Sequence, residues 1–140
     1  MLDFTLSWLP FLAIAVVNFF LSWLYYSPGV PWFKAWQRGI GMEPNKPMTD
    51  EDRKAMPRLM GGAVIASFLL SYGLQVFVHS VKAVDFSTGA VVGVAAWLVF
   101  AVTQSLNSQF EGRKPVVLVI NNVLYLVTYA VFGGLVAIWR

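Results

Sequence analysis

The residues best placed for chemistry form one stripe along a single apolar segment. Four polar residues recur at intervals of four: Ser67, Ser71, Gln75 and His79. This spacing places them on one face of an α-helix. Hydroxyl, amide and imidazole groups in such a row either line a polar pore or hydrogen-bond a neighbouring helix. The stripe is therefore a candidate pore lining or helix interface, and the sequence leaves both alternatives open.

A second set of candidates lies where the apolar segments meet the polar connections. Glu111 is the sharpest of them, because it is the carboxylate next to the end of the apolar segment 86–110. We expect these residues to converge into a structured cluster in which Glu111 pairs with a basic residue of the connection 27–58. The duller alternative is an ion pair at the membrane surface with Arg58, Arg113 or Arg38. The members of this cytoplasmic-face cluster are Tyr26, Ser27, Lys34, Trp36, Asn107, Glu111, Arg113, Asn122 and Tyr125.

Several kinds of chemistry lack the residues they need. The chain has no cysteine and a single histidine, His79, whereas metal sites usually combine several His, Cys or carboxylate ligands. His79 and Glu111 lie at opposite ends of the predicted helices, so no serine–histidine–acid triad can form. No glycine-rich phosphate loop is present. We therefore predict no catalytic residues, no metal and no cofactor, and expect a protein that is not an enzyme.

Four segments of the chain are nearly free of charge and long enough to cross a membrane. They are 8–26, 59–81, 86–110 and 116–139. About twenty apolar residues, rising about 1.5 Å each, cross a hydrocarbon core of about 30 Å. Only 12% of the 140 residues are charged, against about 25% in soluble domains. The sequence predicts an all-α integral membrane bundle of four transmembrane helices, forming a single membrane domain over 1–140.

The basic residues sort to one side of these spans. The connection 27–58 holds six of the ten Lys and Arg residues, and the turn 111–115 holds two more; the other side has only Lys82 and Arg140. Cytoplasmic loops of membrane proteins carry such an excess. We expect a multi-pass protein with the loop 27–58 in the cytoplasm and both termini outside. The positive charge indicates topology and contact with anionic lipid, and we expect no nucleic-acid partner.

The stretch WLYYSPGVPWFKAW (23–36) shows how the first span ends. Pro28 and Pro31 stop the helix, since proline has no backbone N–H to donate. Aromatic rings crowd the same stretch, as they do at the membrane–water interface. The segment 31–38 combines aromatic and basic residues, which predicts a short interfacial helix that Pro31 begins.

Local signals predict the remaining boundaries. Thr49 is a good N-cap for a short helix at 50–56, and Pro57 either begins the second span or kinks a continuous helix. Asp85 or Ser87 caps the third span. The short turns on either side of that span predict that the last three spans are antiparallel neighbours.

Small residues predict close helix packing. Gly89 and Gly93 form a GxxxG pattern, which favours a packing face between membrane helices. A chain this small has a limited interior, and its small-residue faces favour self-association. We therefore expect a homo-oligomer.

Three motifs resemble those of a bacterial family of small four-helix membrane proteins, domain-of-unknown-function family 1761. One is Tyr26-Ser27-Pro28 with the later Phe33, Lys34 and Trp36, and another is Phe110-Glu111-Gly112-Arg113. The third is Asn121 or Asn122 with Tyr125. The chain departs from the family pattern by the insertion of Gly29-Val30-Pro31. The resemblance implies the four-helix fold and a bacterial cytoplasmic (inner) membrane, and it brings no known activity.

Two functions fit this sequence best. A third class, an integral-membrane enzyme acting from the cytoplasmic-face cluster, has only Glu111 as a candidate acid or base. The first is an oligomeric channel or transporter for a small solute, built around the stripe or around a polar cytoplasmic half. No span carries an ionisable group in its middle third, which argues against proton-coupled transport. The second is a non-catalytic accessory protein that binds lipid or a protein partner.

Overall fold

Five helices make up most of the computed structural model, which describes residues 1–139. They are α1 (Trp8–Tyr25), α2 (Phe33–Gly39), α3 (Asp50–Ser80), α4 (Phe86–Phe110) and α5 (Pro115–Ile138). The described residues contain no strand. Four of the helices, all but α2, are long and apolar enough to cross a membrane. The all-helical architecture and its four long apolar helices agree with the prediction.

Helix α3 is longer than the predicted span because it continues through Pro57. It begins with a capping box: the Thr49 hydroxyl accepts from the Asp52 N–H at 3.2 Å, and the Asp52 carboxylate accepts from the Thr49 N–H at 2.9 Å. Each side chain thereby satisfies a backbone donor that the first turn leaves free. The predicted short helix 50–56 and the span that follows are therefore one helix of 31 residues.

The short helix after the first span begins two residues later than predicted. Pro31 and Trp32 lie in turns, and Phe33 is the first residue of α2. At the other end of the bundle Asp85, one of the two predicted caps, caps α4 by accepting from the Thr88 N–H at 2.9 Å. At the end where α2 lies, Pro115 is the first residue of α5.

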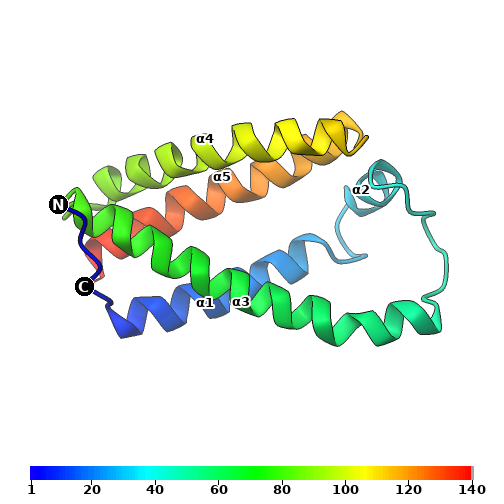
Figure 1. Ribbon diagram of the computed structural model, residues 1–140, viewed down its shortest axis with the longest axis horizontal. Helices are drawn as coiled ribbons and strands as arrows, with labels where there is room; N and C mark the ends of the chain where they lie inside the picture. Colours follow the sequence, from blue (N-terminus) through cyan, green and yellow to red (C-terminus); the bar gives the residue numbers. More distant parts are fainter. Residues whose placement is uncertain (140) are drawn as a thin grey trace.

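The long helices form two pairs (Figure 1). Helix α4 packs along α5, and α1 packs along α3, while α5 also contacts α3 and α1. The prediction that the last three long helices are neighbours is therefore only partly correct, because α3 packs chiefly against α1 and makes few contacts with α4. Side chains of α1, α3 and α5 meet in a shared core that includes Ile14, Leu74, Val78, Phe132 and Val136.

Glycines bring α4 and α5 into backbone contact, as the GxxxG pattern predicts. A Cβ atom at Gly93 would collide with the carbonyl of Tyr129, and one at Gly89 would collide with the carbonyl of Gly133. Gly133 in turn faces the backbone of Gly89 and Gly93. Only residues without a side chain allow this approach.

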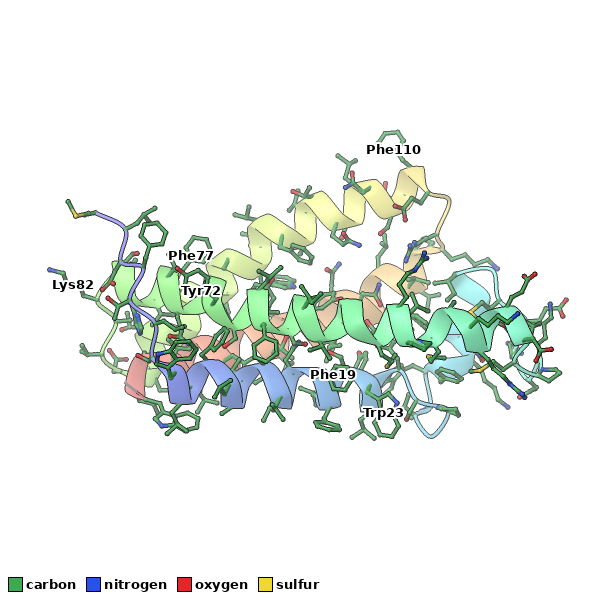
Figure 2. All side chains as sticks on the ribbon, turned by 60° about the horizontal axis from the view of Figure 1, so that its bottom comes forward. Phe19, Trp23, Tyr72, Phe77, Lys82 and Phe110 are labelled. Atoms are coloured by element: carbon green, nitrogen blue, oxygen red, sulfur yellow. The ribbon has the colours of Figure 1, made fainter. Side chains whose placement is uncertain are left out.

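The outer faces of the bundle are apolar. Leu69 on α3, Val99 on α4 and Phe110 at the end of α4 are 66%, 74% and 86% exposed. Figure 2 shows the Phe110 ring pointing away from the other helices. Apolar surface of this extent is typical of helices that contact lipid or another protein.

Candidate functional site

The end of α1 is tied to α5 by two tyrosines. The Tyr25 hydroxyl donates to the carbonyl of Ile120 at 2.8 Å, and the Tyr26 hydroxyl donates to the side-chain oxygen of Asn121 at 2.7 Å. Each phenol has an apolar ring and one polar atom, so burial of the ring requires a partner for the hydroxyl. These bonds position the point at which the chain leaves α1.

Aromatic contacts position α2 against the end of α1. The Trp32 indole donates to the carbonyl of Tyr25 at 2.9 Å, and the ring centroids of these two residues are 4.7 Å apart. Tyr26 and Trp36 are paired in the same way, with centroids 4.9 Å apart. The aromatic residues that Pro28 and Pro31 separate from α1 therefore fold back onto its last turn.

The far end of α2 rests on α5. Gly39 is buried, and a Cβ atom there would collide with the side chain of Val117. The carbonyl of Gly39 also accepts a hydrogen bond from the backbone N–H of Lys114 at 3.3 Å. Helix α2 is thus fastened at both ends: to α1 by aromatic rings and to the α4–α5 turn by its own backbone.

This attachment leaves the charged side chains of α2 exposed. Lys34 and Arg38 lie on its accessible side, and Arg113 and Lys114 are exposed on the adjoining α4–α5 turn. We call these four residues the basic surface. The aromatic side of α2 packs inward while its cations face outward, which gives the helix a fixed orientation.

Glu111 does not pair with the first connection, so that expectation is wrong. Its carboxylate accepts from the Arg113 side chain at 2.8 Å, as in the duller alternative. Gly112 between them has φ +72°, and this tight turn brings both side chains to the same side of it. Both side chains are substantially exposed, so the pair contributes about 0–1 kcal/mol.

The predicted cytoplasmic-face cluster divides into separate contacts. Tyr26 and Trp36 contact each other, and Tyr26 binds Asn121 rather than Asn122. Asn122 instead donates to the hydroxyl of Ser105 on α4 at 2.9 Å. The three remaining uncharged members lie in different surroundings. The Tyr125 ring lies edge-on to Phe100 of α4, Ser27 takes part in the turns after α1, and Asn107 is exposed.

The sequence did not single out Tyr25, Trp32 or Asn121 as members of the candidate site. Two adjacent tyrosines at the end of a span were a usable signal, because two partly buried phenols each favour an acceptor for the hydroxyl. The acceptor of Tyr25 is a backbone carbonyl, and backbone groups leave no trace in a sequence.

The stripe on α3 lies in the interface with α1 and the N-terminal segment. The Asn18 amide donates to the Ser67 hydroxyl at 2.8 Å, and the Ser71 hydroxyl donates to the carbonyl of Phe11 at 2.9 Å. Gln75 makes two bonds to the backbone of Ser7, at 2.8 and 3.3 Å. The fourth member, His79, lies 3.2 Å from the carbonyl of Thr5 through Nδ1. The stripe thus occupies a helix interface within one chain.

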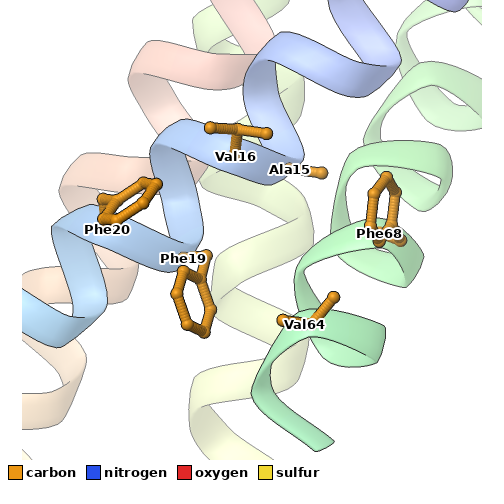
Figure 3. A pocket seen from close by; sticks show the side chains of 6 residues that line it. All are labelled: Ala15, Val16, Phe19, Phe20, Val64 and Phe68. Carbon is orange, nitrogen blue, oxygen red and sulfur yellow. The ribbon is translucent and has the colours of Figure 1, made fainter. Parts of the chain in front are cut away.

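Two hollows accompany this interface. One, of about 90 Å³, lies between α1 and α3 and is lined only by apolar side chains, which Figure 3 shows around it: Ala15, Val16, Phe19, Phe20, Val64 and Phe68. The other, of about 580 Å³, lies at the end of the bundle where the chain begins. No group of three or more His, Asp or Glu side chains that could hold a metal occurs in residues 1–139.

The helices and contacts define a class: a small helical protein with four helices able to cross a membrane. The model of one protein family, described as "Protein of unknown function (DUF1761)", matches residues 9–137. The chain belongs to this family, as the resemblance in its motifs indicated. No curated protein and no solved structure matches the chain.

Proposed function

We propose that the protein is a non-catalytic, multi-pass membrane protein that binds anionic phospholipid headgroups through the basic surface. The attachment of α2 carries this proposal. Its aromatic side packs on α1 and its last residue packs on α5, so Lys34 and Arg38 are held facing outward beside the α4–α5 turn. A fixed set of cations at a membrane surface attracts anionic headgroups, at about 1 kcal/mol per basic residue.

The distribution of charge supports this placement in the membrane. Eight of the ten basic residues lie in the connection 27–58 and the turn 111–115, and such an excess favours the cytoplasmic side. In this topology the basic surface meets the inner leaflet of a bacterial cytoplasmic membrane, and both termini lie on the other side. The aromatic rings of α2 then lie at the depth that amphipathic rings prefer.

The channel or transporter function stays a prediction. The stripe that suggested it is hydrogen-bonded to α1 and the N-terminal segment, so its polar groups are engaged within one chain. Our proposal therefore follows the accessory alternative. Homo-oligomer formation also stays a prediction, and the experiment below measures it.

Native mass spectrometry of the full chain, released from nanodiscs that contain phosphatidylglycerol and phosphatidylcholine, tests the proposal. We expect the wild type to retain phosphatidylglycerol preferentially. Replacement of both Lys34 and Arg38 by Gln removes about 2 kcal/mol of attraction, which corresponds to a roughly 30-fold loss of preference. The same spectrum reports the number of subunits.

The matched control is Arg53→Gln with Lys54→Gln. It removes the same charge from exposed positions in the first turns of α3 but leaves the basic surface intact. We expect the control to keep most of the lipid preference. Equal losses of lipid preference in both double variants would show that only the overall charge matters. An unchanged preference in the variant that lacks Lys34 and Arg38 would overturn the proposal.

A further inference from the structure

The second half of α4 presents a polar face beside its contact with α5. Residues 100, 103, 104 and 107 recur at intervals of three and four, which places them on one side of the helix. They are Phe100, Thr103, Gln104 and Asn107, and we call them the amide face. Thr103 and Asn107 are exposed, and Gln104 is half-buried. The Phe100 ring lies edge-on to Tyr125 of α5, so the amide face borders the α4–α5 contact.

The two side-chain amides of this face have no hydrogen-bond partner in the part of the chain that the structure describes. Within residues 1–139, no hydrogen bond engages the side chain of Gln104 or Asn107. The next polar side chain along the helix, Ser105, is engaged, because its hydroxyl accepts from the Asn122 amide at 2.9 Å. The donors and acceptors of the amide face are therefore left for a partner outside these residues.

Gln104 lies within the hydrocarbon in the membrane placement proposed above. Helix α4 has 25 residues, and at about 1.5 Å each it exceeds a hydrocarbon core of about 30 Å by only about 4 Å at either end. Gln104 lies about 9 Å along the axis from Phe110, the last residue of the helix. Lipid tails offer neither donors nor acceptors. An unbonded amide at this depth costs free energy, and a partner helix removes that cost.

Helix α4 has room for such a partner. It is the least buried of the four long helices, and it packs chiefly against α5. Figure 2 shows its Phe110 end standing away from α3. Val99 and Phe110, four residues before and seven after Thr103, border the amide face and are 74% and 86% exposed. Apolar side chains are therefore in place to pack around the two amides.

We infer that two copies of the chain associate through the amide face, with α4 packed against α4 across a two-fold axis along the membrane normal. A two-fold axis brings the same residues together from both copies. A side-chain amide carries both donors and an acceptor, so a Gln or Asn that meets its own copy gives one hydrogen bond and receives another. The amide face itself carries no charge, and the carboxylate one turn further on, Glu111, is paired with Arg113 at 2.8 Å.

Disulfide crosslinking tests this contact directly, because the chain has no cysteine of its own. Thr103→Cys places a sulfur on the amide face and keeps both amides. Val102→Cys is the control, because it lies about 100° around the helix at a position that is 61% exposed. A disulfide needs Cβ atoms about 4 Å apart, so in liposomes with a mild oxidant we expect about tenfold more linked dimer from Thr103→Cys. Equal yields from the two variants would overturn the inference.

Replacement of the amides measures their contribution. Förster resonance energy transfer between donor- and acceptor-labelled full chains, diluted with lipid in liposomes, gives the dissociation constant of the dimer. We expect Gln104→Leu with Asn107→Leu to raise this constant about 50-fold, through the loss of two reciprocal pairs of hydrogen bonds of average strength for membrane helices. Leucine suits a position that contacts lipid, so we expect circular dichroism to show unchanged helical content. An unchanged dissociation constant would overturn the inference.

The matched control for this measurement is Gln109→Leu. It makes the same change on the same helix, at an exposed position about 140° around the axis from Gln104. We expect this variant to associate as the wild type does. A loss of association as large as that of the double variant would show that the position of the amide does not matter, and would overturn the inference.

The same liposomes separate a second copy from other occupants of the amide face. They contain only this chain and lipid, so energy transfer that decreases with lipid dilution reports association between copies. Chains that stay monomeric at every dilution would overturn the inference and leave lipid or a different membrane protein as the occupant. Linked species that continue beyond the dimer in Thr103→Cys would overturn the two-fold arrangement, because one sulfur on a two-fold axis joins only two chains.

The dimer rests on the proposed membrane placement but not on lipid binding by the basic surface. Gln104→Leu with Asn107→Leu leaves Lys34 and Arg38 intact, so we expect this variant to keep the preference for phosphatidylglycerol in nanodiscs. A dimer without lipid preference would overturn only the proposed lipid binding, and lipid preference without a dimer would overturn only this inference. A chain that does not insert into liposomes would overturn both.

Discussion

The two helix pairs are held together in opposite ways. Between α4 and α5, glycines allow backbone to meet backbone, and a Cβ atom at Gly89, Gly93 or Gly133 would collide with the facing helix. Between α1 and α3, polar side chains cross the interface and bind backbone groups or each other. The first interface depends chiefly on shape, with one side-chain hydrogen bond from Asn122 to Ser105, and the second depends on several hydrogen bonds.

Buried polar groups follow the same division. Within residues 1–139, the buried side-chain atoms without a hydrogen-bond partner are the Trp97 indole nitrogen and the Ser108 hydroxyl, and both belong to α4. On α3, by contrast, Ser67, Ser71 and Gln75 all have partners. Membrane helices associate through close packing or through interhelical hydrogen bonds. Each pair of this protein relies mainly on one of these two means, so substitutions can test them separately.

The largest effect is expected from Gly93→Ala. Its Cβ atom meets the backbone carbonyl of Tyr129, which cannot move without shifting α5. We expect a loss of about 3 kcal/mol, the upper end for overpacking, in unfolding experiments in mixed micelles. The control is Gly62→Ala on α3, where nothing lies within 4 Å of the added atom. Similar losses in both variants would show that the shape of the α4–α5 interface is not critical.

Gln75→Leu should have the next largest effect. Leucine has a similar size but leaves the N–H of Ser7 without its partner, whereas the Ser7 carbonyl loses the Gln75 amide and keeps the Phe11 N–H. We expect a loss of about 2 kcal/mol in the same unfolding measurement, together with faster hydrogen exchange at Ser7. Phe77→Leu, at an exposed position on the same helix, is the control. Unaltered exchange at Ser7 would contradict the role assigned to Gln75.

A smaller effect is expected for the bond between Asn18 and Ser67, because membrane interhelical bonds contribute about 0.6 kcal/mol on average. A double-mutant cycle with Asn18→Ala and Ser67→Ala isolates this bond. We expect a coupling free energy of about that size between the two sites. Strict additivity would mean that the 2.8 Å contact adds nothing to stability.

The comparison also explains which features were predictable. The bounds of α4 match the predicted span because local signals define them: Asp85 caps its first turn and Gly112 adopts the positive φ of the turn that follows. The α4–α5 packing was predictable for a similar reason, since a GxxxG pattern is written in the side chains. Loop length alone did not predict the partner of α3, which lies chiefly along α1.

The two uses of the stripe could not be separated from its sequence. A pore and an interface both require polar residues at intervals of four, and the partners here are largely backbone atoms of Ser7 and Phe11. The contacts of the cytoplasmic-face cluster are divided for a geometric reason. Asn121 and Asn122 are about 100° apart around a helix, so one faces Tyr26 on α1 and the other faces Ser105 on α4.

The smallest expected effect is a pH dependence of stability that arises from Asp85, in the turn that joins the two helix pairs. At the start of α4, the Thr88 backbone N–H and then the Thr88 hydroxyl donate to Asp85 at 2.9 and 2.7 Å. These bonds favour the charged carboxylate and hold the pKa of Asp85 below its usual value. A lowered folded-state pKa stabilises the fold above the unfolded pKa of about 3.9. This contribution is lost as the pH falls through the lower folded value.

We therefore expect the stability of wild type to fall below about pH 4 relative to that of Asp85→Asn, which has no carboxyl group to titrate. The measurement is thermal unfolding in detergent across this range, with the difference between the two proteins plotted against pH. Because the turn between α3 and α4 joins the two helix pairs, a pH-dependent difference would show that they unfold together. A flat difference would mean that the start of α4 opens without disturbing either interface.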